Sequence, residues 1–218
     1  MPIEVTIDLR TKFGPARDQK QRPTCMAFAA SDAHSAVRGT LEFLSTEFAF
    51  FHAVRRRSPL DPHRGVSFSL MAKALHQDGQ PPEATWPYLS VLPADLKNWK
   101  PPATCAPIFR RAYQIESPSL ARVYSRLNKS HAVVITTTIS ASFFRPSAEG
   151  IITAPPSEPA INTHAVIAVG YGKNQSGNLV LIRNSWGPRW GIQGHAWVTE
   201  DYLMPRLLNI GLAKLKEN

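Results

Sequence analysis

The sequence predicts an α+β protein whose first half is helical and whose second half consists mainly of β-strands. In the first half, apolar residues recur at helical spacing in three segments, and in the second half several segments are rich in β-branched residues. The 218 residues, 43% of them hydrophobic, are enough to bury a core. We therefore expect a single domain over residues 1–218, with a mainly helical lobe at about 13–110 and a mainly β lobe at about 111–218.

The helical half is predicted from its apolar patterns and from the residues that begin and end them. Residues 25–37 follow Thr24, a favourable N-cap, and predict a tightly packed helix. A second helix is predicted from residue 45 or 46 to residue 57, and a third from about residue 67 to Gly79. Before them, residues 4–9 alternate apolar and polar side chains, which predicts a short strand that joins the β lobe.

A proline-rich loop, residues 80–107, follows the helical half. Ser117 and Pro118 then provide an N-cap and a first helical residue for one more short helix. The strands predicted after this helix cover residues 132–139, 165–171, 178–183 and 194–199.

Cys25 is the residue of greatest chemical interest because it lies in the first turn of the first predicted helix. The positive end of the helix dipole favours the thiolate, which is the nucleophilic form of cysteine. Gln19 lies six residues upstream and brings a side-chain amide donor towards the same place. Far downstream, His164 and Asn184 follow within the segments NTHAVIAVGYG and IRNSWGPRWG. Each residue alone carries little weight, whereas the ordered set predicts a nucleophile with its proton carrier.

This ordered set resembles the papain-like cysteine peptidases of the C1 type, whose catalytic cysteine, histidine and asparagine follow in this order. The similarity extends to IDLRTKFGPARDQKQ near the start, to GVSFSLMAKAL and TWPY in the middle, and to GHAWV near the end, so that it covers practically the whole chain. It implies a papain-like two-lobed fold, a helical lobe followed by an antiparallel β-sheet or barrel lobe, with the active-site cleft between them.

The resemblance also implies a role for each of four catalytic residues. Cys25 would attack the scissile carbonyl, and His164 would hold the thiolate as an ion pair and then protonate the leaving amine. Asn184 would orient the imidazole ring. The side-chain N–H of Gln19 and the backbone N–H of Cys25 would form the oxyanion hole.

Six further residues are implied to bind substrate. Trp186 would cover the His164–Asn184 contact, and the backbone of Gly65 would pair with the extended substrate. The residues expected to line the pocket for the second residue before the cut are Phe68, Thr136, Asn162 and Ala165. Asn162 would make that pocket more polar than an aliphatic one.

The sequence departs from the family pattern at the cysteines. Arg22 stands where the family has a cysteine that anchors a disulfide, and Cys105 is the only cysteine besides Cys25. In this respect the sequence resembles the minimal bacterial members of the family, which lack the propeptide and the disulfides. We expect a cytoplasmic protein that is active as made, or one exported as an effector by a signal-independent route, because no signal peptide is visible.

The net charge of +9 indicates a solvated basic surface, with an acidic substrate or partner as the alternative. No nucleic-acid motif and no apolar run of membrane-spanning length is present in the sequence. The expected partners are a peptide or protein substrate and a separate protein inhibitor, and the expected state is a monomer. Cys105 has no neighbours at ligand spacing, and the resemblance implies neither a metal nor an organic cofactor.

The resulting prediction is a cysteine endopeptidase. A thiol acyltransferase or deamidase would use the same acyl-enzyme with a different acceptor, and a pseudo-enzyme would use the cleft only to bind peptides. The presence of all four catalytic residue types argues against the pseudo-enzyme, because a binding protein has no use for the complete set.

Overall fold

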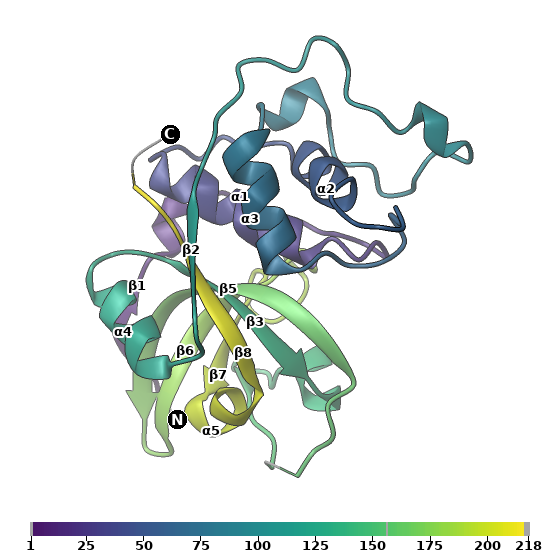
Figure 1. Ribbon diagram of the computed structural model, residues 1–218. Coiled ribbons are helices and arrows are strands. Elements are labelled where there is room, and N and C mark those ends of the chain that lie inside the picture. Colours follow the sequence, from purple (N-terminus) through teal and green to yellow (C-terminus); the bar gives the residue numbers. More distant parts are fainter. Residues whose placement is uncertain (1, 156, 216–218) are drawn as a thin grey trace.

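The computed structural model describes residues 2–155 and 157–215, and its elements form two lobes stacked one above the other (Figure 1). The upper lobe contains the helices α1 (Cys25–Val37), α2 (Thr46–Val54) and α3 (Phe68–Gln77). The lower lobe contains an eight-stranded sheet with the helices α4 (Leu120–Asn128) and α5 (Glu200–Leu203). Within the described residues, no helix is long and apolar enough to cross a membrane. The α+β prediction is confirmed.

The sheet brings together strands from both ends of the chain. Its strands are β1 (Glu4–Asp8), β2 (Tyr113–Glu116), β3 (Val133–Ile139), β4 (Ile151–Ile152), β5 (Asn162–Asn174), β6 (Gly177–Arg183), β7 (His195–Thr199) and β8 (Leu207–Ala213). The order is β2-β8-β3-β5-β6-β7-β4, and β1 pairs with β5 as expected for the N-terminal strand. All pairs are antiparallel except β4 with β7.

Both faces of the sheet are buried, which explains why its central strands are continuously apolar. On β5, Ala165, Ile167 and Val169 pack into the core shared with the helical lobe, whereas Val166 and Ala168 pack into a second core under α4 and α5. Successive side chains of a strand point to opposite faces, so one run of residues supplies both cores.

A glycine on β5 allows β1 to lie close to it. A Cβ atom at Gly170 would lie 2.3 Å from the carbonyl oxygen of Ile7, which is closer than non-bonded atoms approach. A side chain at this position would therefore push β1 away from the sheet.

Two helix starts in the upper lobe follow the sequence prediction. The Ser45 side chain accepts a hydrogen bond from the Phe48 N–H at the start of α2, and Ser67 accepts one from Leu70 at the start of α3. Gly79 has a φ of +74° after the end of α3, a conformation that favours glycine.

Other boundaries differ from the prediction. The helix predicted after residue 117 begins at Leu120, because Ser119 rather than Ser117 caps it by accepting from the Arg122 N–H. Thr24 precedes α1 but does not cap it with its side chain, since its hydroxyl lies 2.8 Å from the Tyr88 hydroxyl instead. The helix predicted to end at residue 57 ends at Val54 and continues as turns.

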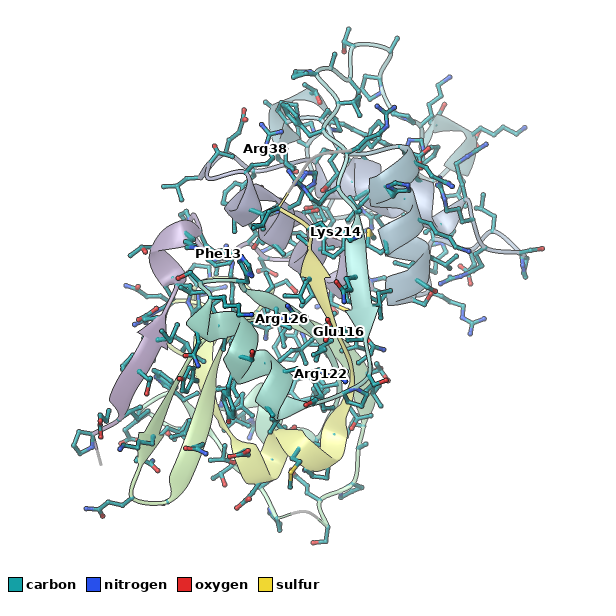
Figure 2. The ribbon with its side chains drawn as sticks, turned by 60° about the vertical axis from the view of Figure 1, so that its left-hand side comes forward. Phe13, Arg38, Glu116, Arg122, Arg126 and Lys214 are labelled. Atoms are coloured by element: carbon teal, nitrogen blue, oxygen red, sulfur yellow. The ribbon has the colours of Figure 1, made fainter. Side chains whose placement is uncertain are left out.

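An ionic contact between α4 and the edge strand β2 stabilises the outer side of the β lobe. Arg126 of α4 lies 2.8 Å from a carboxylate oxygen of Glu116, and Arg122 lies 3.9 Å from the other one. Figure 2 shows the three side chains together beside the lower part of β2. The carboxylate of Glu116 therefore links α4 to the strand that precedes it.

A buried cluster of charges joins the two lobes next to the cleft. Asp32 of α1 accepts hydrogen bonds from Arg17 at 2.5 Å and from Arg183 of β6 at 2.8 Å. Burial raises the pKa of Asp32, but the two guanidinium groups outweigh this effect and lower it below the ordinary value. Because Asn184 follows Arg183 directly, this cluster sets the position of Asn184 relative to α1.

Candidate active site

Cys25 begins α1 and His164 lies on β5, and both line one cavity. The helix α1 packs against β5 at the junction of the lobes (Figure 1). Burial raises the pKa of Cys25, but the charge of His164, a hydrogen bond with its ring, and the backbone N–H groups of Ala165 and Met26 lower it below the ordinary thiol value. For His164, burial lowers the pKa, but Cys25 and a hydrogen bond with Asn184 raise it above the ordinary value. Both shifts favour a thiolate paired with an imidazolium.

Asn184 determines the orientation of the imidazole ring. Its side-chain oxygen lies 2.7 Å from Nε2 of His164 and also accepts the backbone N–H of Ser185 at 2.8 Å. Asn184 is 3% exposed, so water does not compete for this contact. With Nε2 donating to Asn184, the other ring nitrogen of His164 is the one directed at the thiol.

Aromatic side chains shield the histidine. The ring centroid of Trp186 lies 4.8 Å from that of His164, and Phe143 contacts both rings. Phe144 stacks on Trp186 at 5.0 Å and remains 46% exposed. Trp190 packs edge-on against Trp186 at 5.7 Å. These rings keep water from the His164–Asn184 hydrogen bond, which strengthens it.

Gln19 is held rigidly in the segment that precedes Cys25. Its side-chain nitrogen donates to the Arg22 carbonyl oxygen at 2.8 Å, and its side-chain oxygen accepts from the Ser185 hydroxyl at 2.7 Å. Its backbone N–H donates to the Ser185 carbonyl oxygen, and its own carbonyl oxygen accepts from the Tyr88 hydroxyl. The amide nitrogen carries a second hydrogen, which is available to an anion beside the free N–H groups at the start of α1.

A buried ion pair occupies the place where the family pattern has a disulfide cysteine. Arg22 makes two hydrogen bonds to the carboxylate of Glu47 on α2, at 2.6 and 3.0 Å, and donates another to the Leu89 carbonyl oxygen. The same carboxylate accepts from the Trp99 indole N–H at 2.6 Å and from the Leu89 N–H at 3.0 Å. The segment that carries Gln19 is thereby attached to α2 and to the loop over residues 86–99.

A cavity of about 660 Å³ begins at Cys25 and His164 and extends along the cleft. Of the residues expected to bind substrate, four line it: Gly65, Thr136, Asn162 and Ala165. Phe68 is not among the residues that line the cavity. Its ring is 4% exposed and packs between α3 and the β lobe, against Tyr113 of β2 and Gly211 of β8.

Val66 and Ser67 take the place in the cavity wall that was expected for Phe68. Trp186 does not line the cavity; its ring lies over His164, as expected for a residue that covers the His164–Asn184 contact. The carbonyl oxygen of Gly65 already accepts a hydrogen bond from Arg57, which leaves one lone pair for a substrate.

Sequence reasoning missed several residues that complete the site. Ser185 and Tyr88 position Gln19, and Arg57, Asp61 and Arg64 line the cavity. Ser185 was detectable in principle because it lies between Asn184 and Trp186 in one motif, and Tyr88 because it ends the segment TWPY. The three cavity residues belong to an irregular loop with no local pattern.

No metal-ligating group of three or more His, Cys, Asp or Glu side chains occurs among the residues that the structure describes. Cys105 is only partly buried, and its sulfur lies 3.9 Å from the Thr85 hydroxyl.

The family model described as papain family cysteine protease matches residues 71–205, a segment that contains His164 and Asn184 but begins after Cys25. Cathepsin R of Mus musculus is 28% identical over 208 residues, which cover 89% of this chain and 60% of that protein. Cathepsin L2 of Homo sapiens is 27% identical over 219 residues, covering 92% of this chain and 62% of that protein. The chain thus spans less than two thirds of the length of either relative.

Solved structures share the fold. Xylellain, a cysteine protease from Xylella fastidiosa, superposes with a TM-score of 0.78 at 20% identity and covers 98% of this chain and 87% of its own. The proform of the ragweed pollen allergen Amb a 11, also a cysteine protease, superposes with a TM-score of 0.73 at 23% identity and covers 99% and 66%. Both lobes are therefore included in the likeness.

Proposed function

Because the chain belongs to the papain family of cysteine proteases, we propose that it is an endopeptidase that cleaves peptide or protein substrates through a thioester on Cys25. One observation carries the proposal. His164 lies between the Cys25 thiol and the side-chain oxygen of Asn184, and both pKa shifts favour the charged pair. A peptide-binding protein gains nothing from an ionised thiol in its cleft.

In the first step, the Cys25 thiolate attacks the scissile carbonyl carbon and the carbonyl oxygen becomes an oxyanion. The second side-chain N–H of Gln19 and the backbone N–H of Cys25 stabilise this charge. The carboxamide of Gln19 needs no reorganisation, since Arg22 and Ser185 already hold both of its ends.

His164 carries the proton through both halves of the reaction. As imidazolium it protonates the leaving amine while the C–N bond breaks, which leaves a thioester and a neutral ring. The neutral ring then takes a proton from water as the hydroxide adds to the thioester. Release of the carboxylic acid restores the thiolate and the imidazolium. Asn184 keeps the ring in one plane during both transfers without adding a charge.

The decisive experiment treats the purified chain, in reducing buffer, with a thiol-directed epoxide and with a diverse peptide library. Endopeptidase activity yields new amino termini by mass spectrometry, and the epoxide labels Cys25. Absence of labelling, or labelling that persists in Cys25→Ala, would refute the proposal. Peptide amides or esters formed with added nucleophiles, in place of new amino termini, would identify an acyltransferase instead.

A further inference from the structure

The cavity beside Cys25 has one cationic wall and one wall of uncharged polar groups. The loop between α2 and α3 contributes Arg57, Asp61 and Arg64 from the helical lobe, and β3 contributes Thr136 from the β lobe. The charges of the Cys25–His164 pair cancel each other. The net charge of the lining is therefore positive, because it has two arginines and one carboxylate.

Arg57 is held in place by neutral groups alone. Its guanidinium donates to the carbonyl oxygens of Asp61 at 3.0 Å and Arg64 at 3.2 Å, and also to that of Gly65. Among the described residues, no carboxylate forms an ion pair with Arg57 or with Arg64. The positive charge is therefore fixed in position and is not neutralised within the protein.

The opposite wall includes the Thr136 hydroxyl, which has no hydrogen-bond partner in the part of the chain that the structure describes. Thr136 lies directly opposite Ala165 on β5 and Asn209 on β8, so the three side chains share one face of the sheet. The hydroxyl of Thr136 and the side-chain oxygen of Asn209 are both buried and have no hydrogen-bond partner among the described residues. Thr136 lines the cavity, whereas Asn209 does not. An aliphatic substrate side chain would leave the Thr136 hydroxyl unpaired, which is unfavourable, whereas a polar one can bond to it.

These observations rest on the proposed function and extend it to the substrate. We propose that the cavity binds an acidic side chain, glutamate above all, at the second residue before the cut. One carboxylate oxygen accepts from the Thr136 hydroxyl, and its negative charge balances the net positive charge that Arg57, Arg64 and Asp61 give to the lining.

The test compares kcat/KM for peptides that differ only at that position, which holds Glu, Gln, Leu or Arg. We expect kcat/KM to be roughly tenfold higher for the Glu peptide than for the Gln peptide, because a hydrogen bond to a charged group contributes about that factor. Arg64→Gln should lower the Glu-to-Gln ratio roughly twofold to fivefold, because its charge is exposed and screened. Thr136→Val should lower kcat/KM for both the Glu and the Gln peptide roughly fivefold relative to the Leu peptide.

Matched controls are available on the same elements. Arg55→Gln removes a charge from the end of α2 outside the cavity, and Thr138→Val changes the same residue type further along β3. Neither should alter the ratios. Binding of the Glu and Gln peptides to Cys25→Ala, measured by calorimetry, gives the same comparison without turnover.

The outcomes separate this inference from the proposed function. The inference is overturned, with the peptidase left intact, if a Leu or Arg peptide is cleaved as well as the Glu peptide. It is also overturned if Arg64→Gln leaves the Glu-to-Gln ratio unchanged and Thr136→Val leaves the Glu-to-Leu ratio unchanged. Absence of cleavage of every peptide together with absence of epoxide labelling refutes the peptidase itself.

Discussion

The buried ion pair Arg22–Glu47 stands where the family pattern has a disulfide, and its contribution to stability can be tested quantitatively. Arg22 is 7% exposed and Glu47 is 0% exposed, and two hydrogen bonds of 2.6 and 3.0 Å join them. Arg22→Met leaves the carboxylate buried with only the N–H groups of Trp99 and Leu89. Removing one partner of such a pair costs about 3–5 kcal/mol of unfolding free energy. For a chain of this size, that lowers Tm by roughly 6–20 °C.

The double variant Arg22→Met/Glu47→Gln removes both charges. The side-chain oxygen of the new glutamine still accepts from either Trp99 or Leu89. The other of these two buried N–H groups loses its partner, at a cost of about 1–3 kcal/mol. We therefore expect the double variant to be more stable than Arg22→Met alone, with a coupling energy of about 2 kcal/mol or more.

Urea unfolding of the wild type, both single variants and the double variant measures these free energies. Lys20→Met is a matched control, since Lys20 pairs with Asp18 at 2.9 Å with its side chain 56% exposed, and an exposed pair contributes about 0–1 kcal/mol. The reasoning is refuted if Arg22→Met costs no more than Lys20→Met, or if the two single costs add up in the double variant.

Four predictions concern the chemistry. Cys25→Ala should abolish turnover with unchanged Tm, whereas Cys105→Ser should retain nearly full activity; the opposite result would identify Cys105 as the nucleophile. In single-turnover acylation, Asn184→Ala should leave measurable activity and His164→Ala far less, and equal losses would contradict a purely orienting role for Asn184. Gln19→Ala should lower kcat by about 10²–10³-fold with little change in KM, and a loss confined to KM would argue against an oxyanion donor. In a pH series, kcat/KM should rise as Cys25 loses its proton below the ordinary thiol pKa and fall as His164 deprotonates above the ordinary imidazole pKa; a profile whose only rise lies near the ordinary thiol pKa would exclude the ion pair.

Part of the fold was predictable because its signals are local. Serines before the helices and β-branched runs act within a few residues, so α2, α3 and the central strands appear where the sequence places them. The strands β2, β4 and β8 were not predicted. The segment LLNIGLA of β8 has no regular alternation, and it becomes a strand because β2 and β3 pair with it on both sides.

For the site, the sequence by itself determined which residue types carry the chemistry, since Gln19, Cys25, His164 and Asn184 stand in order within recognisable segments. The structure brings these four residues together, as the two pKa shifts and the hydrogen bonds of Gln19 and Asn184 describe. Ser185, which holds the Gln19 side chain, shares the segment of Asn184 and was accessible to the same reasoning.

Only the tertiary structure decided how the site is supported and what its cavity presents to a substrate. Ser67 lies in the cavity wall, whereas the next residue, Phe68, is buried in the core. Sequence patterns do not predict which of two adjacent residues at a helix start faces the cavity. The contacts of Arg22 with Glu47 and of Arg57 with the loop carbonyls depend on where separate loops meet in space. Buried charges and loop geometry have no periodic sequence signal, because the partner that makes each of them favourable is supplied by the folded chain.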